Sequence, residues 1–386
     1  LDAWRDAAAE FGIPKIKEFN RGDNFGNAYF QMNQRRGVRW NATKAYLRPA
    51  ENRPNLTVLS NILVEKVELN NSSQRPRATG VKIRRADKSS TIFKADQEVL
   101  LSAGAIGSPQ ILQLSGIGSS ELLGSRNIPI RVDLRGVGEN LQDHLQVRSV
   151  YQVENTVTLN QKAGSLIGKA LMGLEYFFFK TGPLTMPPSQ LGAFAKSDPN
   201  RSTANIEWHV QPLSLDKFGD PLHKFNAITP SVCNLRPTSR GQVRIKSNDP
   251  EEHPTIRLNY LSTSEDEEVA VEGLRFTRRI MRAEALKKFN PVELKPGAEI
   301  QTDTQLLEAA RDLGTTIFHP VGTCKMGSDE SAVVNDRLEV HGVANLRVID
   351  ASIMPTITSG NTNAPTVMIA EKGAKFILEK SAENYT

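Results

Sequence analysis

The sequence predicts a mixed α/β fold (α+β overall), in which part of a Rossmann-like domain is joined to a separate antiparallel sheet. First, the nearly continuous apolar run Glu98–Leu101 is typical of a buried parallel strand, and it leads directly into the small residues Ser102–Ala105. Second, Leu346–Ile349 predicts a short strand that delivers an acid at its end. Third, residues 206–210 and 227–234 alternate as antiparallel strands do. Strand–helix units and an antiparallel layer are therefore expected in one chain.

Composition limits the class of protein. The 386 residues can bury a sizeable core and favour two domains. With 39% hydrophobic and 24% charged residues and a net charge of +5, the chain has the composition of an ordinary globular protein. Basic residues do not cluster with aromatic ones, which argues against nucleic-acid binding. Cys233 and Cys324 form no disulfide framework, so we expect a reducing, cytoplasmic location.

The first hundred residues predict one helix, a loop and a set of strands. Residues 1–12 favour a helix that Gly12 ends, and the Gly-, Asn- and Arg-rich residues 20–40 favour a loop. Residues 70–76 predict a turn. Strands are expected over residues 56–59, 62–69, 80–84 and 91–94. After the strand at Glu98, we expect a helix capped by Ser108, with Pro109 in its first position and Gly116 after its end.

The middle of the chain differs in character. Residues 166–179 are the most apolar stretch and predict a helix buried on one face, too short to span a bilayer. Attachment to a membrane surface through residues 176–179 is a minor alternative, and we do not expect membrane association. Residues 242–247 are expected to add a strand to the antiparallel sheet, which would have one exposed face. Residues 264–288 return to a helical pattern.

The block Phe318–Cys324 contains a candidate base. The pKa of histidine lies near neutral pH, and Pro320 restrains the backbone of His319 toward extended conformations. A structural histidine packed in the core is the alternative. No second histidine or acid follows at a metal-ligating spacing and Cys324 alone does not build a site, so we expect no metal.

A second block of candidate residues follows the strand at 346–349. Asp350 stands at the carboxyl end of that strand, where cofactors dock in open α/β sheets. Gly360 permits a tight backbone path past a ligand. From about Asn363 the pattern predicts a helix with Pro365 in its first turn, and its N-terminus would favour an anion such as a phosphate or a reduced flavin.

Several blocks resemble the glucose–methanol–choline (GMC) oxidoreductases, which are FAD enzymes that oxidise alcohols. The stretch GAIGSPQILQLSGIG, residues 104–118, is similar to a signature of that family at every constrained position. GVGENLQDH at residues 136–144, residues 239–241 and the blocks around His319 and Asp350 are similar as well, in the order that the family has. The resemblance extends over almost the whole chain.

The resemblance implies roles for individual residues. His319 would be the catalytic base and Asn361 its partner, both hydrogen-bonded to the substrate oxygen while a hydride passes to flavin N5. The carboxylate of Asp350 would repel phosphate, so we expect it to order nearby amides and hydroxyls. The residues expected at FAD are Val64, Ala103, Gly104, Phe318, Asp350, Ala351 and Asn363.

The same resemblance implies three regions. Residues 1–147 would be the remainder of an FAD-binding domain, 148–300 a substrate-binding domain with an antiparallel sheet, and 301–386 a return to the FAD domain with the catalytic pair. The Gly-x-Gly-x-x-Gly fingerprint of the family is not found, and the chain starts at Leu1 without a targeting segment. We therefore expect an N-terminal truncation that removes the first βαβ unit.

The substrate is expected to be an uncharged primary alcohol, oxidised to an aldehyde, with a quinone, a dye or oxygen as the electron acceptor. A choline dehydrogenase is an alternative, but residues 223–227, where choline-specific members carry an acid, have none. An FAD-containing hydroxynitrile lyase and an inactive fragment are further alternatives.

Overall fold

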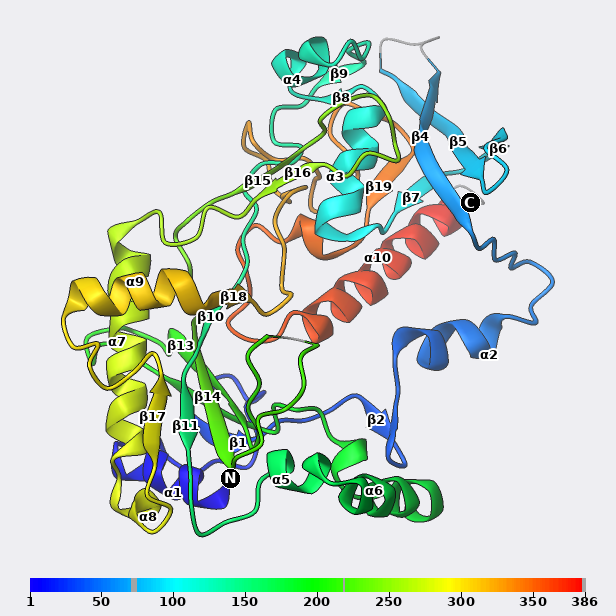
Figure 1. Ribbon diagram of the computed structural model, residues 1–386. Helices are drawn as coiled ribbons and strands as arrows, with labels where there is room; N and C mark the ends of the chain where they lie inside the picture. Colours follow the sequence, from blue (N-terminus) through cyan, green and yellow to red (C-terminus); the bar gives the residue numbers. More distant parts are fainter. Residues whose placement is uncertain (71–74, 218, 384–386) are drawn as a thin grey trace. The chain divides into compact units, whose positions relative to one another are not determined.

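A computed structural model describes residues 1–70, 75–217 and 219–383 (Figure 1). The contacts within it divide the chain into two compact units. The first consists of Leu1–Val58, Leu145–Leu235 and Ser264–Thr315, and the second of Leu59–His144, Arg236–Thr263 and Thr316–Thr386. The functional division predicted above, at 1–147, 148–300 and 301–386, stays a prediction. The turn predicted at 70–76 lies largely outside the described residues.

The first unit is built on an antiparallel sheet. The strand order is β1–β12–β13–β14–β10–β18, and β11 pairs with both β14 and β17. The strands of this sheet are β1 (Gly26–Tyr29), β10 (Leu145–Arg148), β11 (Val150–Gln152), β12 (Leu191–Ala195), β13 (Ile206–Gln211), β14 (Ala227–Asn234), β17 (Val292–Lys295) and β18 (Gly314–Thr316). A separate hairpin joins β2 (Gln34–Arg35) to β3 (Val38–Arg39).

The first unit also contains helices. They are α1 (Asp2–Glu10), the π-helix η1 (Thr43–Leu47), α2 (Arg48–Ala50), α5 (Leu159–Gly164), α6 (Leu166–Phe179), the 3₁₀ helix η2 (Pro183–Thr185), α7 (Ser264–Met281), α8 (Glu284–Lys287) and α9 (Asp303–Leu313). The pattern at 264–288 therefore forms two helices rather than one. A Thr302 capping box, in which Thr302 and Gln305 bond each other's backbone, begins α9, a helix that the sequence analysis does not predict.

The second unit contains smaller sheets. Its strands are β4 (Ile62–Asn70), β5 (Arg77–Arg85), β6 (Ser90–Lys94), β7 (Val99–Leu101), β8 (Ile117–Gly118), β9 (Val132–Asp133), β15 (Gln242–Arg244), β16 (Thr255–Arg257) and β19 (Leu346–Val348). Its helices are α3 (Gly104–Leu114), α4 (Ser120–Ser125), the 3₁₀ helix η3 (Ala351–Ile353) and α10 (Asn363–Glu383). The mixed α/β fold class is thus confirmed, with parallel pairing of β7 with β19 and antiparallel pairing in the large sheet.

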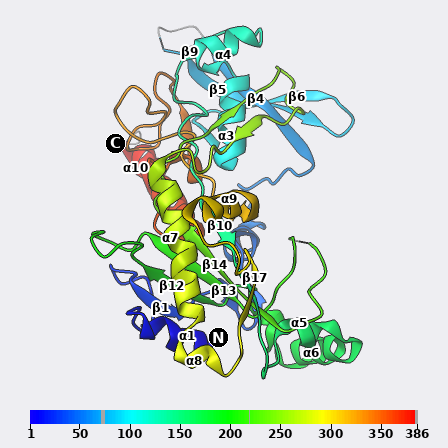
Figure 2. The same ribbon diagram turned by 60° about the vertical axis from the view of Figure 1, so that its left-hand side comes forward.

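The large sheet is buried on both faces, so the prediction of one exposed face is wrong. Helix α7 runs along one face (Figure 2), where Trp208 donates to the hydroxyl of Thr277 at 2.8 Å and meets the ring of Phe276 edge to face. Trp208 is fully buried. The alternating residues of β13, Glu207 and His209, point to the other face and are also buried, because that face is covered as well.

Glu207 is a buried acid on that second face. It is fully buried, and its Oε1 lies 3.3 Å from Nε2 of His209, without the geometry of a hydrogen bond. Burial raises the pKa of the Glu207 carboxyl to about 8. The neutral form is therefore the one that the fold accommodates.

Two further expectations are wrong in the first 60 residues. The loop predicted at 20–40 contains β1, which pairs with β12. The polar Asn27 is buried in this strand, because its side chain donates to the carbonyl of Ile13 at 2.7 Å. Residues 56–59, predicted as a strand, form neither helix nor strand in the described chain. Leu56, Val58 and Leu59 are exposed there, so no burial supports a strand.

The strand predicted at 242–247 also lies elsewhere. Its first residues form β15, which pairs with β16 in the second unit instead of joining the large sheet. Alternation identifies a strand but not its partner, and here the partner is the next strand along the chain, β16, which begins eleven residues after β15 ends.

Helix α3 begins four residues before the predicted cap. Its first residue is Gly104, so Ser108 lies inside the helix and Pro109 occupies the sixth position instead of the first. A proline there cannot donate to the carbonyl of Ala105, four residues earlier. The hydroxyl of the buried Thr323 donates to that carbonyl at 2.6 Å and replaces the missing bond.

The role of the Thr323 hydroxyl, which replaces the N–H that Pro109 lacks, can be tested with Thr323→Val. We expect the variant to lower the free energy of unfolding by about 1–3 kcal/mol, because the carbonyl of Ala105 loses its partner. In a Pro109→Ala background the same change is expected to cost less, since residue 109 then offers an N–H to that carbonyl. Urea denaturation of all four proteins measures the coupling, and strictly additive effects would show that Thr323 does not compensate for Pro109.

Glu207 predicts a pH dependence of stability. The pKa of Glu207 in the folded chain is about 8, above its ordinary value of 4.5. Its contribution to the free energy of unfolding is therefore fully present below pH 4.5 and is lost as the pH rises to about 8. The loss has an upper bound of about 5 kcal/mol. Glu207→Gln is expected to flatten the unfolding free energy across this window, whereas Glu121→Gln, at an exposed position, should leave the profile unchanged. Identical profiles for the parent and Glu207→Gln would contradict the assignment.

Candidate active site

His319 lies on the loop after β18 and is 9% exposed. Its Nδ1 lies 3.0 Å from Nδ1 of His144, so one of these nitrogens donates a hydrogen bond to the other. The two rings meet edge to face, with centroids 5.2 Å apart. Because each ring has a second nitrogen, the direction of this bond decides which tautomer His319 adopts.

Asp143 holds the backbone of the same loop. Its carboxylate accepts hydrogen bonds from the amide of His319, at 2.9 Å, and from the hydroxyls of Thr316 and Tyr260. Burial raises the pKa of the Asp143 carboxyl, and these donors oppose the rise. Burial, together with the charge of Asp143, also raises the pKa of Tyr260, which keeps its hydroxyl a donor. Asp143 therefore positions His319 through its main chain.

Phe318 has an unusual backbone conformation beside the candidate base. Its φ of 64° lies in the left-handed region, which bulky residues rarely adopt. Its amide donates to the hydroxyl of Thr316 at 2.8 Å, and the residue is 68% exposed. Strained residues of this kind cluster at functional sites.

Gln142 ties the loop of Asn361 to the loop of His319. Its main chain forms a β-bridge with the residue two places after His319. Its side chain donates to the carbonyl of Pro355 at 3.1 Å and accepts from the amide of Ile357 at 3.2 Å. Asn361 follows four residues later and is exposed. Both loops are thus fixed to one segment, while contact between the two candidate side chains stays a prediction.

Asp350 stands where the parallel strands β7 and β19 end, as expected. Its Oδ2 accepts from the amide of Gly104 at 2.9 Å and from the hydroxyl of Ser108 at 2.5 Å. Its Oδ1 accepts from the amide and the hydroxyl of Ser352 at 2.8 and 2.5 Å. Both oxygens are engaged by donors of the chain itself, which agrees with the ordering role expected for this carboxylate.

The backbone beside Asp350 is accessible to a ligand. Gly104 has a φ of +76°, and among the described residues no atom beyond its chain neighbours and helix backbone lies within 4 Å of the position that a Cβ would take. Ala103 is exposed. Helix η3, which starts at Ala351, packs against α3 and α10. The exposed Asn363 begins α10, whose N-terminus carries partial positive charge.

Val64 lies at an irregularity of β4. The pairing of β4 with β5 shifts register between Val64 and Lys66. A bulge of this kind disrupts the ladder and leaves main-chain groups unpaired, so they can meet a ligand. Together with the open turn at Gly104 and the start of α10, this strand fits a dinucleotide such as FAD. Contact of the individual residues with FAD stays a prediction.

Asp143, His144 and Tyr260 are residues of this site that no spacing in the sequence predicts. Asp143 and His144 precede His319 by 176 and 175 positions. Their only signal is an acid–histidine pair inside one of the blocks that resemble the family. Tyr260 carries no such signal, because only the folded chain brings it to Asp143.

Cys324 behaves as a packing residue, whereas Cys233 lies beside an acid and a histidine. Cys324 is fully buried, and burial raises the pKa of its thiol, as does the charge of Asp350. In the part of the chain that the structure describes, Glu207, His209 and Cys233 have donor atoms within 4.8 Å of one another. Zinc accepts these donor types. The expectation of no metal stays a prediction.

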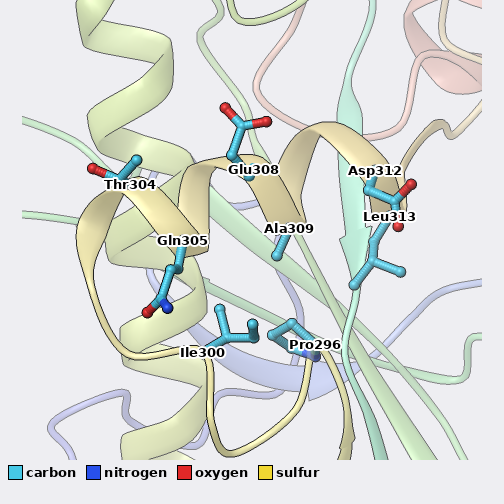
Figure 3. Close-up of a pocket in the computed structure, with 8 residues that line it drawn as sticks. All are labelled: Pro296, Ile300, Thr304, Gln305, Glu308, Ala309, Asp312 and Leu313. Atoms are coloured by element: carbon cyan, nitrogen blue, oxygen red, sulfur yellow. The ribbon is translucent and has the colours of Figure 1, made fainter.

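A pocket of about 400 Å³ lies beneath α9 in the first unit (Figure 3). Pro296 and Ile300 line the side opposite α9, Leu313 lines it from the end of α9, and the carboxylate of Glu308 pairs with Arg311. None of the predicted site residues is among those that line it. Its chemistry does not indicate a reaction.

Comparison with known sequences supports the family resemblance. Two sequence profiles, each described as GMC oxidoreductase, match residues 1–146 and 237–370. An oxygen-dependent choline dehydrogenase of Escherichia coli is 40% identical over 385 residues, which are 99% of this chain and 68% of that protein.

Solved structures agree. Pyridoxine 4-oxidase from Mesorbium loti is 28% identical with a TM-score of 0.84, covering 97% of this chain and 68% of that one. An FAD-dependent oxidoreductase from Chaetomium thermophilum is 26% identical with a TM-score of 0.89, covering 99% and 72%. A formate oxidase is 25% identical with a TM-score of 0.91, covering 99% and 70%. These likenesses confirm the predicted oxidoreductase class and support FAD as the cofactor: the chain belongs to the GMC oxidoreductase family.

Proposed function

We propose that this chain provides the catalytic residues for FAD-dependent oxidation of a primary alcohol to an aldehyde. The observation that carries the proposal is the 3.0 Å contact between Nδ1 of His319 and Nδ1 of His144. A small-molecule alcohol and an electron acceptor (a quinone, a dye or oxygen) are the proposed partners.

The contact with His144 suits His319 to act as a base. When Nδ1–H of His319 donates to Nδ1 of His144, the lone pair of His319 is on Nε2. Nε2 then takes the proton of the substrate hydroxyl, and the imidazolium that forms keeps its bond to His144. Asp143 prevents the loop from moving away, since it binds the amide of His319.

Asn361 is assigned to orientation of the substrate. Its carboxamide is neutral, so it can donate a hydrogen bond to the substrate oxygen but cannot remove the proton. His319 is therefore the only base of the pair. A neutral donor also avoids the repulsion that a second cationic histidine would bring.

The cofactor is proposed to lie along the second unit. FAD, when bound, accepts the hydride that leaves the alcohol carbon. Asp350 keeps the amide of Gly104 and the start of η3 in place, so that the backbone there is already ordered before binding. The residues proposed to hold FAD are Val64, Ala103, Gly104, Phe318, Asp350, Ala351 and Asn363.

An uncharged alcohol is preferred over choline as the substrate. The E. coli relatives are named choline dehydrogenases, which makes choline the second candidate. A quaternary ammonium requires aromatic faces and usually a carboxylate. Near the stretch without an acid, His223 stacks on Phe225, but the neighbouring carboxylate of Asp216 is already paired with His223 and Lys295. The carboxylate of Asp216 is therefore not available to neutralise a cationic substrate.

Removal of the base tests the mechanism. His319→Ala is expected to slow substrate-dependent bleaching of the flavin absorbance by about 10²–10⁴-fold, because proton removal is lost while cofactor binding is kept. His253→Ala, at an exposed position, is the matched control and should oxidise at the parental rate. Unchanged bleaching in His319→Ala would remove His319 from the mechanism. A parent protein whose flavin no alcohol bleaches would instead favour a hydroxynitrile lyase or an inactive chain.

The substrate preference is measured by stopped-flow reduction of the flavin. We expect neutral primary alcohols to reduce it faster than choline, because the carboxylate of Asp216, which contacts His223, is already paired with His223 and Lys295 and does not offset the charge of an ammonium. Each substrate is compared at equal concentration and pH. Rapid reduction by choline alone would overturn this preference and make the second candidate the function.

A further inference from the structure

Helix α6 presents its apolar stripe to solvent. Ile167, Leu171, Leu174 and Phe178 follow the spacing of four, three and four residues that places side chains on one face. They are 75%, 61%, 52% and 67% exposed. The expectation of a helix buried on one face is therefore wrong, since no residue of α6 is buried.

The exposed patch is larger than this stripe. It also includes both ends of the helix, and its members are Leu166, Ile167, Leu171, Leu174, Phe177, Phe178 and Phe179. Both ribbon views draw α5 and α6 side by side at the margin of the first unit (Figures 1 and 2). A cluster of large exposed apolar side chains on one helix is typical of a binding surface.

Basic residues also occur on α5, on α6 and directly after α6. Lys162 and Lys169 are exposed on α5 and α6, and the ammonium of Lys180 lies 4.4 Å from the ring centroid of Tyr176. Glu175 is the one acid of α6, and it accepts a hydrogen bond from Thr181. Long cationic side chains in this arrangement can keep their charge in water while their stems lie against apolar groups.

A second basic element contacts the end of the helix. The β2–β3 hairpin approaches so closely that a Cβ on Gly37 would lie 2.0 Å from the carbonyl oxygen of Lys180. Residues 24–50 contain no acid. Arg35, Arg36 and Arg39 are exposed on this hairpin. The apolar patch is thus flanked by positive charge on a neighbouring element.

We propose that α6 and the β2–β3 hairpin form a docking surface for an anionic phospholipid membrane. The helix has 14 residues, about 21 Å of length at the usual rise, which is too short to cross a bilayer. In the part of the chain that is described, no helix is both long and apolar enough to span a membrane. The helix lies in the interface instead, with its apolar stripe among the acyl chains and the arginines at the headgroups.

The charge distribution favours lipid over a second copy of the chain. In a two-fold dimer the same patch meets itself. Both copies would then bring a basic hairpin to the same interface, where their like charges add and repel. An anionic membrane offers acyl chains to the apolar stripe and negative headgroups to the flanking arginines.

Vesicle flotation tests the apolar half of the proposal. The full chain is mixed with vesicles of phosphatidylcholine containing about a quarter phosphatidylglycerol. The triple variant Ile167→Gln, Leu174→Gln, Phe178→Gln is expected to bind at least about tenfold more weakly, because it removes apolar side chains from the stripe. Ile92→Gln with Ile256→Gln changes residues that are exposed outside this patch, and it should bind as the parent does.

The charged half is tested in the same assay. Arg35→Gln, Arg36→Gln, Arg39→Gln is expected to lose binding by roughly tenfold and to lose most of its salt dependence. Because all these side chains are exposed, circular dichroism should match the parent. Absence of binding by the parent, equal binding by the variants, or binding indifferent to lipid charge would overturn the proposal. So would a parental dimer in sedimentation velocity that the apolar variant dissociates without any effect of vesicles. None of these readouts depends on the proposed oxidation.

Discussion

The carboxylate of Asp350 is the interaction on which the second unit depends. It joins the ends of two parallel strands to the start of α3, through Gly104 and Ser108, and to η3, through Ser352. The carboxylate accepts four short hydrogen bonds from donors that the chain already holds in place. Hydrogen bonds to a charged acceptor are stronger than those to a neutral one. The turn that the carboxylate orders contains the open backbone at Gly104, where FAD is proposed to bind.

The loop of the candidate base is attached to this turn. The amide of Cys324 donates to the carbonyl of Ser352 at 2.9 Å, and the amide of Met326 donates to that of Ile353 at 2.8 Å. Thr323, one residue before Cys324, donates to the carbonyl of Ala105 in α3, which Pro109 has no N–H to bond. Buried bonds therefore lead from Asp350 to the segment after His319, while Asp143 and His144 hold the other side. Rigid support of this kind is what positioning of a catalytic group requires.

Local patterns predicted the elements but not their partners. The apolar run before Gly104, the strand before Asp350 and the helix from Asn363 were all recoverable, because each depends on neighbours in sequence. Asp143 meets His319, and Tyr260 meets Asp143, only through tertiary contacts, so no spacing could reveal them.

The wrong predictions arose because a local pattern does not identify the tertiary partner of an element. Residues 242–247 alternate like a strand but pair outside the large sheet. The periodicity of α6 correctly predicted an amphipathic helix, yet periodicity cannot say whether the apolar side faces a core or solvent. Residues 56–59 have strand-forming side chains with no partner to bury them.

The central claim is that His144 holds His319 in the tautomer of a base. The chain has six histidines, so ¹⁵N-labelled histidine gives few signals, and the His319→Ala variant identifies that of His319. Long-range ¹H–¹⁵N correlation of the resting protein distinguishes the two nitrogens of each ring. We expect a proton on Nδ1 of His319 and none on Nε2. A proton on Nε2 with a bare Nδ1 would mean that His319 accepts the bond from His144, and would contradict its assignment as the base.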